Sequence, residues 1–264
     1  MKETRIFYNK CPLCDSDDLR KAVIGDCSKH ALYKEQIPST MQWMDCQICY
    51  HQFVDGYFNK EALDLIFEMT HDNQKVGYQI EKQRFISSRI VEKIITYKSN
   101  GLWLDIGFGN GSLIFTAKEY GFKVVGVDLR KDNVEALRNL GIEAYCDKLE
   151  NVDFKTKISV ASLMDVLEHI PYPKQILKVL YSKMEESGYL IISMPNSESI
   201  LWKLMSQENQ NPYLGEIEHY HNFSRTRLFD LLEECGFKIV KYGISERYRL
   251  CMEIIASKNN IFKL

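Results

Sequence analysis

From residue 101 onward, short apolar runs alternate with segments in which apolar residues recur three or four positions apart. A short apolar run fits a buried strand, whereas the wider spacing fits a helix with one apolar face. The strand-like runs are GLWLDI, FKVVGVD, IEAYC, ISVASLM, YLIISM, FKIVKYGI and LCMEIIAS. The helix-like segments are SLIFTAKEY, KDNVEALRNL, 176–184 and RTRLFDLLEECG. This alternation predicts a doubly wound α/β fold around a mostly parallel sheet of seven strands.

The region between residues 61 and 98 has a helical pattern. KEALDLIFEM predicts a short helix. QIEKQRFISSRIVEKIITYK places three isoleucines four positions apart, which predicts one apolar face on a helix of about five turns. We therefore expect a helical connection between a small N-terminal module, residues 1–60, and a larger domain, residues 99–264. The longer helix should pack against the sheet of that domain.

The cysteines are unevenly placed, since five of the eight lie in the first 49 residues. Cys11 and Cys14 form one C-x-x-C pair, and Cys46 and Cys49 form another. Two such turns supply four thiolates, the ligand set of a closed, structural zinc site. The 31 residues between the pairs are more than is usual, and Cys27 in this stretch is a candidate spare or substitute ligand. A redox role is disfavoured, because redox C-x-x-C motifs do not usually come in duplicate.

The charge of the chain is close to balanced, with 34 basic and 36 acidic residues and a formal net charge of −2. This balance gives no electrostatic reason to expect a nucleic acid or an anionic membrane as a partner. The start of the sequence lacks the apolar core of a signal peptide. No apolar run approaches the roughly 20 residues of a membrane helix. We therefore expect a cytoplasmic protein with a small-molecule partner, and we leave its oligomeric state open.

A glycine-rich loop follows the first of the predicted parallel strands, in LWLDIGFGNGSL. Gly107, Gly109 and Gly111 allow the backbone to turn tightly and to approach a ligand without interference from Cβ atoms. In doubly wound sheets the ligand binds at the carboxyl ends of the strands, which is where this loop is expected. The loop is therefore the first candidate for a binding site.

A nicotinamide dinucleotide is the first ligand to consider for such a loop. Its fingerprint is G-x-G-x-x-G, followed by a strand-end acid about 20 residues later. Asp128 supplies the acid, but Ser112 stands in the third glycine position. Asp105, which precedes the loop, would also repel a pyrophosphate, whereas it suits a ligand with an ammonium group. The residues therefore favour a nucleoside with a cationic amino-acid part and no phosphate.

These motifs resemble those of a known family. LDIGFGNG looks like the first motif of class I S-adenosylmethionine-dependent methyltransferases, and Asp128 looks like the acid that ends their second strand. The resemblance implies a Rossmann-like fold, ribose hydroxyls bound by Asp128, and an adenine amino group near Asp147. It also implies that Asp105 helps to hold the loop and favours the positive charge of the cofactor. The implied cofactor-binding residues are Asp105, Gly107, Gly109, Asn110, Gly111, Asp128, Leu129, Asp147 and Met164.

The resemblance covers about residues 75–264. MDVLEHIPYP is similar to the segment after the fourth strand in many small-molecule methyltransferases, and HYHNFSRTRLFDLLEECGFKIV is similar to their final helix and strand. C-x-x-C pairs ahead of such a domain recur in methyltransferases of bacterial sugar, capsule and natural-product pathways. The resemblance therefore implies methyl transfer to oxygen, or less readily carbon, of a sugar, a nucleotide-linked sugar or a surface-polysaccharide precursor.

A hydroxyl acceptor must lose a proton during methyl transfer. His169 in DVLEHI is the first choice for the general base, with Glu168 as its neighbour or orienting group. The alternative is that His169 only hydrogen-bonds and shapes the pocket. The long segment 196–223 is rich in aromatic and polar residues, and we expect it to form an acceptor-binding cap.

A divalent ion such as magnesium is a second route to the same proton loss. Asp165, Glu168 and His169 offer three oxygen or nitrogen ligands within five residues. Some methyltransferases with an acid-x-x-Glu-His segment bind a divalent ion there and complete the site with a distant histidine. His219 or His221 would supply it here, with Tyr220 between them as a further acceptor-site candidate. In the alternative, these histidines contact the acceptor or pack.

Two rival functions remain open at this point. The first is an RNA methyltransferase that grips RNA with its zinc module, but the charge balance disfavours it. The chain also lacks the Asn-Pro-Pro-Tyr tetrapeptide of amino-methyltransferases, since the NPY at 211–213 lacks one proline and does not follow the fourth strand. The second is a non-catalytic binding protein, which the intact set of loop glycines and strand-end acids disfavours.

Overall fold

The structure is a computed structural model that describes residues 4–66 and 72–259. Within these residues, the chain forms two compact units, each assembled from three segments. The cysteine unit contains residues 4–66 together with 168–174 and 195–231, and the sheet unit contains the rest of the described residues. Neither unit is continuous in sequence. The predicted boundaries at residues 60 and 98 stay a prediction about domains.

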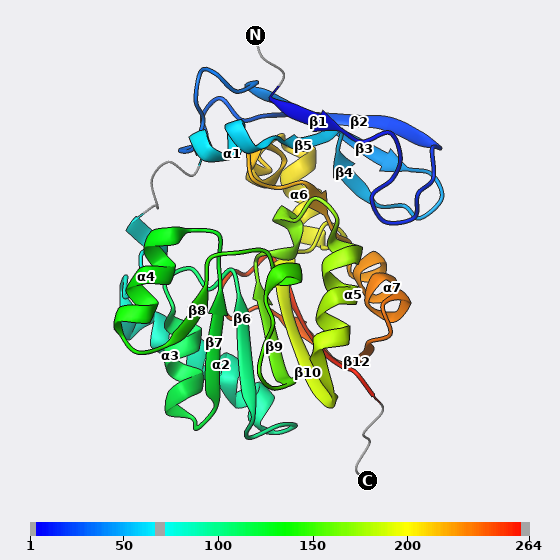
Figure 1. Cartoon of the computed structure of the whole chain (residues 1–264). Coiled ribbons are helices and arrows are strands. Elements are labelled where there is room, and N and C mark those ends of the chain that lie inside the picture. The colour runs from blue at the N-terminus through cyan, green and yellow to red at the C-terminus, as the bar shows by residue number, and fades with distance from the viewer. Residues whose placement is uncertain (1–3, 67–71, 260–264) are drawn as a thin grey trace. The chain divides into compact units, whose positions relative to one another are not determined.

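The sheet unit is built on seven strands in the order β12-β13-β10-β9-β6-β7-β8, of which the run from β10 to β8 can be followed in Figure 1. The pairs β10–β9, β9–β6, β6–β7 and β7–β8 are parallel, whereas β12 and β13 are antiparallel. The strands are β6 Leu102–Ile106, β7 Lys123–Val127, β8 Glu143–Tyr145, β9 Ile158–Met164, β10 Met184–Pro195, β12 Lys238–Ile244 and β13 Cys251–Ser257. The predicted doubly wound, mostly parallel Rossmann-like sheet is confirmed.

Helices flank this sheet (Figure 1). In the sheet unit they are α2 Ile80–Ile95, α3 Ser112–Glu119, α4 Lys131–Asn139 and, for most of its length, α5 Pro173–Lys183, with the short 3-10 turns η1 Asp72–Gln74 and η2 Leu149–Asn151. Most of α7 Arg225–Glu234 and of the 3-10 turn η3 Leu167–His169 belongs to the cysteine unit. The apolar face of α2 is buried against the sheet, where Ile90, Val91 and Ile94 pack with Trp103 and Ile255. The expected packing of the long helix is therefore confirmed. The burial of this apolar face of α2 helps to stabilise the core of the sheet unit.

The cysteine unit contains strands that the sequence pattern did not predict. They are β1 Arg5–Phe7, β2 Leu19–Asp26, β3 Thr40–Cys46, β4 Gln52–Val54, β5 Gly56–Phe58 and β11 His221–Asn222. Four of them form a sheet in the order β11-β4-β3-β2, and β1 pairs with β5. Most of these strands are three residues long or less, and six of the eight residues of β2 are exposed. The short strands therefore have too few residues, and β2 too few buried ones, to show an alternation of apolar and polar positions.

The segment 196–223, expected as an acceptor cap, belongs to the cysteine unit. It contains α6 Ile200–Gln207, η4 Pro212–Gly215 and β11, which pairs with β4. Its Ile217 and Tyr220 are buried with Trp43 and Phe58 in one apolar core, and the Trp43 indole N–H donates to Leu214 O at 2.9 Å. Whether the segment covers an acceptor stays a prediction.

The short helix predicted from KEALDLIFEM is observed as α1 Lys60–Ile66, and the rest of that prediction falls outside the described residues. Over 4–66 and 72–259, none of the helices has the length and apolar character that a bilayer crossing requires.

Candidate functional site

The glycine loop joins β6 to α3 in a conformation that only glycine adopts readily. Gly107, Gly109 and Gly111 have φ angles of 66°, 51° and 75°, all in the left-handed region. A Cβ atom on Gly107 would lie 2.7 Å from Cγ2 of Val166, whereas one on Gly109 would meet no atom within 4 Å. The loop therefore packs closely on one side, and the backbone at Gly109 is open to a ligand on the other.

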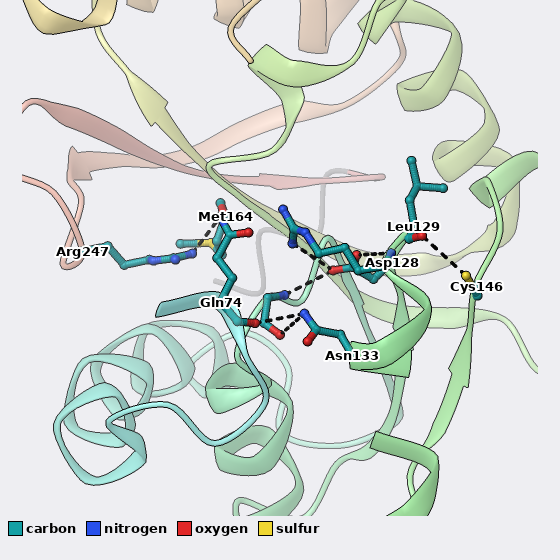
Figure 2. A network of polar contacts seen from close by, with 9 residues as sticks. Gln74, Asp128, Leu129, Asn133, Cys146, Met164 and Arg247 are labelled. Carbon is teal, nitrogen blue, oxygen red and sulfur yellow. Dashed lines mark hydrogen bonds and ion pairs between the residues drawn. The ribbon is translucent and has the colours of Figure 1, made fainter. Parts of the chain in front are cut away.

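Asp128 lies just beyond the end of β7 and connects that strand end to the glycine loop. Its side chain is buried, and its two oxygens accept hydrogen bonds from the backbone N–H of Arg130, at 2.9 Å, and of Gly109, at 3.4 Å. The Arg130 guanidinium lies 3.7 Å from one of these oxygens. Figure 2 shows this network. A carboxylate is thus held beside Gly109, at the carboxyl edge of the sheet.

A segment before the long helix is also held against this loop. The Asn133 side chain donates to Gln74 O at 2.9 Å and to Gly109 O at 3.1 Å (Figure 2), and Gly77 N–H donates to Asn110 O at 3.0 Å. Asn133 is almost fully buried in the first turn of α4. It was not predicted from the sequence, because an asparagine near the start of a helix has no distinguishing pattern.

Asp105 is buried at the end of β6 and accepts a hydrogen bond from Ser162 Oγ at 2.6 Å. Burial raises the pKa of this carboxyl to about 7, although the Ser162 hydroxyl and the charge of Arg247 oppose the increase. A substantial fraction of Asp105 is therefore protonated near neutral pH. The expectation that it favours a cationic ligand stays a prediction, and the sequence offered no signal for its partner Ser162.

Leu129 and Asp147 lie at the ends of the adjacent strands β7 and β8. The Leu129 side chain is exposed, and Cys146 Sγ lies 3.5 Å from its carbonyl oxygen, as drawn in Figure 2. Asp147 is exposed and accepts hydrogen bonds from Lys148 N–H, at 2.7 Å, and from the Asn151 amide, at 2.8 Å. An exposed apolar side chain near a carboxylate is a surface on which a purine base with an amino group could lie.

A small cavity of ≈ 30 Å³ lies between α2, the glycine loop and the end of β9. It is lined by Gln83, Ile86, Ser87, Ile90, Asn110, Ser112, Leu113, Met164 and Arg247. Met164, predicted from the sequence to contact the cofactor, is buried, and its carbonyl accepts a hydrogen bond from Arg247 at 3.0 Å. Arg247 was not predicted, because no motif marks the short connection between β12 and β13.

The four predicted zinc ligands, Cys11, Cys14, Cys46 and Cys49, come together in the cysteine unit, with all four sulfur atoms within 4.8 Å of one another. The Cys11–Cys49 and Cys14–Cys46 sulfur distances are 3.6 and 3.5 Å. Four thiolates around tetrahedral zinc, with Zn–S bonds of about 2.3 Å, would lie about 3.8 Å apart. The ligand set and its spacing therefore fit zinc.

The two cysteine pairs have the same local geometry, which supports this fit. The residue after each pair is in the left-handed region, with φ of 59° at Asp15 and 55° at Tyr50. The N–H of each donates to the carbonyl of the first cysteine of its pair, at 3.0 and 3.1 Å. Cys27 does not join the group and lies in the apolar core with Trp43.

Glu168, His169 and His219 form a second cluster, also in the cysteine unit, in which one ligand atom from each lies within 4.8 Å of the others. His169 Nδ1–H donates to Glu218 O at 2.9 Å, so the lone pair of the neutral ring is on Nε2. Burial holds the pKa of His219 well below its ordinary value, with a further decrease from His169. A buried neutral imidazole is the form that binds a metal ion or accepts a proton.

Two of the other predicted acceptor or metal residues have different partners. His221 begins β11, donates through Nε2 to Ile170 O at 2.9 Å and accepts through Nδ1 from His51 at 2.9 Å. Tyr220 is buried in the core of the cysteine unit, and its hydroxyl accepts from Phe58 N–H at 3.4 Å. His219 and His221, the two candidates for the distant histidine, have different neighbours, since His219 packs edge-on against His169 whereas His221 pairs with His51.

Asp165 belongs to the sheet unit, where its partners are a serine and an arginine. Its Oδ1 accepts from Ser193 Oγ at 2.8 Å, and its Oδ2 lies 3.5 Å from Nε of Arg247. In the cysteine unit, His219 lies within ligand distance of Glu168 and His169, and a part for Asp165 in the same set stays a prediction.

Comparison with known proteins identifies a family for this fold. A family model described as a methyltransferase domain matches residues 78–242, more than half of the chain. Among curated proteins, the ubiquinone biosynthesis O-methyltransferase of Proteus mirabilis is 26% identical over 123 residues, which cover 42% of this chain and 50% of that protein. The enzyme of the same name from Bradyrhizobium diazoefficiens is 28% identical over 106 residues, covering 38% and 41%. The chain thus spans half or less of the length of these relatives.

Solved structures show the same fold. An S-adenosylmethionine-dependent methyltransferase from Archaeoglobus fulgidus superposes with a TM-score of 0.55 at 21% identity, covering 67% of this chain and 94% of that one. The magnesium protoporphyrin IX methyltransferase of Synechocystis, with bound S-adenosylhomocysteine, gives a TM-score of 0.54 at 19% identity, covering 77% and 97%. At these identities the likeness concerns the fold alone.

Proposed function

We propose that this chain, which belongs to the methyltransferase-domain family, transfers the methyl group of S-adenosylmethionine to a hydroxyl oxygen of a small polar metabolite. The observation that carries the proposal is the glycine loop, with the backbone at Gly109 open and the carboxylate of Asp128 beside it. This loop lies within the matched residues, at the carboxyl edge of the sheet. Asp128 would accept hydrogen bonds from the ribose hydroxyls, and Leu129 and Asp147 would flank the adenine.

Transfer to oxygen is supported by the curated relatives, whose names describe O-methyltransferases. These names concern ubiquinone biosynthesis, and none of the relatives named above supports the sugar predicted from the arrangement of the cysteine module. We keep a sugar or nucleotide-linked sugar as one acceptor class to test, beside phenolic hydroxyl compounds. An RNA acceptor is disfavoured by the charge balance of the chain.

The protein has little covalent chemistry to carry out, because the sulfonium of the cofactor already activates the methyl group for transfer. The protein must align the acceptor oxygen with the methyl group and remove the hydroxyl proton. We propose that Nε2 of His169 accepts the hydroxyl proton, because its Nδ1–H already donates a hydrogen bond to Glu218 O. Glu168 follows Asp165 by three positions, so covalent geometry alone keeps their Cα atoms within about 11 Å of each other. The candidate base is thus tethered to the strand end that carries Met164.

The cluster of Glu168, His169 and His219 also fits a divalent ion. Two imidazoles and one carboxylate suit Zn²⁺ or Mn²⁺ better than Mg²⁺, which prefers oxygen ligands. Such an ion would lower the pKa of an acceptor hydroxyl. His219, which is neutral because it is buried, supplies a ligand without having to lose a proton.

The proposal is tested first by calorimetric titration of the protein with S-adenosylmethionine, with NAD as the control ligand. Micromolar binding of the first compound alone is expected. Acceptor classes are then compared by the release of S-adenosylhomocysteine, with sugars, nucleotide sugars, phenols and RNA as separate arms. Each arm is run with Mn²⁺, Zn²⁺, Mg²⁺ or EDTA. Binding of NAD but not of S-adenosylmethionine would contradict the proposal, and turnover of RNA alone would replace the acceptor class.

A further inference from the structure

The small cavity beside the glycine loop has one charged residue in its lining. Among the described residues around it, Gln83, Ser87, Asn110 and Ser112 bring neutral polar groups, and Arg247 brings a positive charge. The volume of ≈ 30 Å³ exceeds the roughly 10–15 Å³ that one water needs, and it is far below that of a pocket for a whole nucleoside. The cavity therefore fits one small polar group, and its charge selects an anion.

A second feature favours the same sign of charge. Asn110, Ser112 and Leu113, which line the cavity, belong to the N-terminal end of α3 and the loop before it. The first N–H groups of a helix have no partner within the helix and carry partial positive charge, which stabilises an anion nearby. The guanidinium and the helix N-terminus come from different parts of the chain, and both act on this one cavity.

Arg247 is held in place by two groups at the end of β9. Its Nη1 donates to Met164 O at 3.0 Å, and its Nε lies 3.5 Å from Oδ2 of Asp165. Figure 2 shows the side chain of Arg247 extended toward Met164. The side chain remains 34% exposed, so the guanidinium is oriented while part of the side chain stays accessible.

Asp165 is itself fixed in an unusual conformation. Its φ of 60° is uncommon for a residue with a side chain. Two hydrogen bonds hold it there: Asp165 N–H donates to Ser193 O at 2.8 Å, and Ser193 Oγ donates to Oδ1 of Asp165 at 2.8 Å. The carboxylate that faces Arg247 is thus held by backbone and side chain alike.

We propose that Arg247 binds the carboxylate at the amino-acid end of S-adenosylmethionine, and that Asp165 is a positioning residue for the guanidinium. The inference rests on the proposed function, since it requires the glycine loop to hold this cofactor. If Asp128 binds the ribose and the ligand passes the open backbone of Gly109, the amino-acid end of the ligand still needs a binding site. The cavity with Arg247 adjoins the same loop at Asn110 and Ser112. Guanidinium and carboxylate groups pair through strong, charge-assisted hydrogen bonds.

The experiment compares two ligands that differ only in the carboxylate, S-adenosylhomocysteine and its decarboxylated analogue. Their affinities for the wild-type protein and for Arg247→Gln are measured by calorimetry. The substitution is expected to weaken binding of S-adenosylhomocysteine about 10- to 100-fold and binding of the analogue less than about 2-fold. Arg247→Lys keeps the charge and should recover part of the loss. Arg249→Gln, in the same connection between β12 and β13, is the matched control and should change neither affinity.

The outcomes separate this inference from the proposed function. If the wild-type protein binds neither compound, the proposed function fails and the inference fails with it. If the wild type binds both and Arg247→Gln binds S-adenosylhomocysteine equally well, the inference alone is overturned. It is also overturned if Arg247→Gln weakens both compounds equally, because Arg247 then acts by supporting the fold. A higher acceptor KM with unchanged S-adenosylhomocysteine affinity would assign Arg247 to an anionic acceptor instead.

Discussion

The two units of this protein assemble their candidate sites in different ways. In the sheet unit, the glycine loop, Asp128 and Asp147 each follow a strand, and the parallel pairing of β6, β7 and β8 brings these strand ends to one edge. In the cysteine unit, each cluster joins segments that are far apart in the chain. Cys14 meets Cys46 across 32 positions, and His169 meets His219.

The difference has an energetic consequence. A core within the sheet unit holds its strand ends in place. The removal of one side chain at a strand end should therefore weaken ligand binding and leave the fold intact. The cysteine unit also has an apolar core, but four of its six described strands have three residues or fewer, and small units with little regular structure commonly depend on a metal for stability. The two units should therefore respond differently to substitutions in their sites.

The largest effect is expected from Cys46→Ser combined with Cys49→Ser. The wild-type protein should carry about one zinc per chain, whose binding to a four-thiolate site is worth on the order of 10 kcal/mol. The double variant should lose the metal, and the cysteine unit should unfold while the sheet unit keeps its affinity for S-adenosylmethionine. Metal analysis, hydrogen exchange and calorimetry measure these three results.

Cys27→Ala is the control for this experiment. Because Cys27 lies outside the four-cysteine group, this variant should keep its zinc. A wild-type protein that is folded but contains no zinc would end the idea of a structural metal, and loss of zinc in the control would make Cys27 a ligand.

The next largest effect is expected at the second cluster. His169→Ala should lower turnover about 100-fold or more, because it removes the group assigned to the hydroxyl proton. Affinity for S-adenosylmethionine should change less than about 2-fold, since no cofactor contact is lost. Steady-state kinetics and calorimetry on the same preparation measure both.

Glu168→Gln distinguishes the two roles of this cluster. If the cluster holds a metal, this variant should lose turnover that excess Mn²⁺ or Zn²⁺ restores in part, whereas direct base catalysis by His169 is insensitive to added metal. Near-normal turnover of His169→Ala would leave the cluster with a packing role.

A smaller effect is expected from Asp128→Ala in the sheet unit. The loss of two hydrogen bonds to ribose should weaken S-adenosylmethionine binding by about 2–3 kcal/mol. The unfolding midpoint of the sheet unit should change little by comparison. Asp132→Ala, at an exposed position on α4, is the matched control and should bind normally. Equal affinities of wild type and Asp128→Ala would remove Asp128 from the site.

An effect of opposite sign, a gain of stability, is expected from Asp105→Asn. The pKa of Asp105 is raised by burial from 3.8 to about 7, so the unfolded chain releases this proton at lower pH than the folded protein does. The wild type therefore loses stability as the pH rises from about 4 to about 7, by on the order of 2–4 kcal/mol. Asp105→Asn cannot lose the proton and should be the more stable protein at pH 8, with a smaller difference at pH 5. Urea unfolding of the ligand-free protein at both pH values measures this, and an equal difference at both would show that Asp105 is not the titrating group.

Most of the sheet unit could be predicted because its signals are local. A strand that is buried on both faces reads as an apolar run, and a helix that covers it shows apolar residues at every third or fourth position. The handedness of the crossover connections then brings successive strand ends to one edge. The glycine loop, Asp128 and Asp147 could therefore be located before their contacts were known, as could the two cysteine pairs, whose tight turns depend on adjacent residues alone.

Packing between distant segments decided the rest. The sequence places His219 and His221 two positions apart, but only the tertiary structure gives the first to His169 and the second to His51. Arg247 lies 82 positions beyond Asp165, and no spacing rule connects them. Periodicity and turn chemistry are properties of neighbouring residues and can be read along the chain. The partner of a buried side chain depends on which distant segments exclude water together, and that is settled only when the whole chain folds.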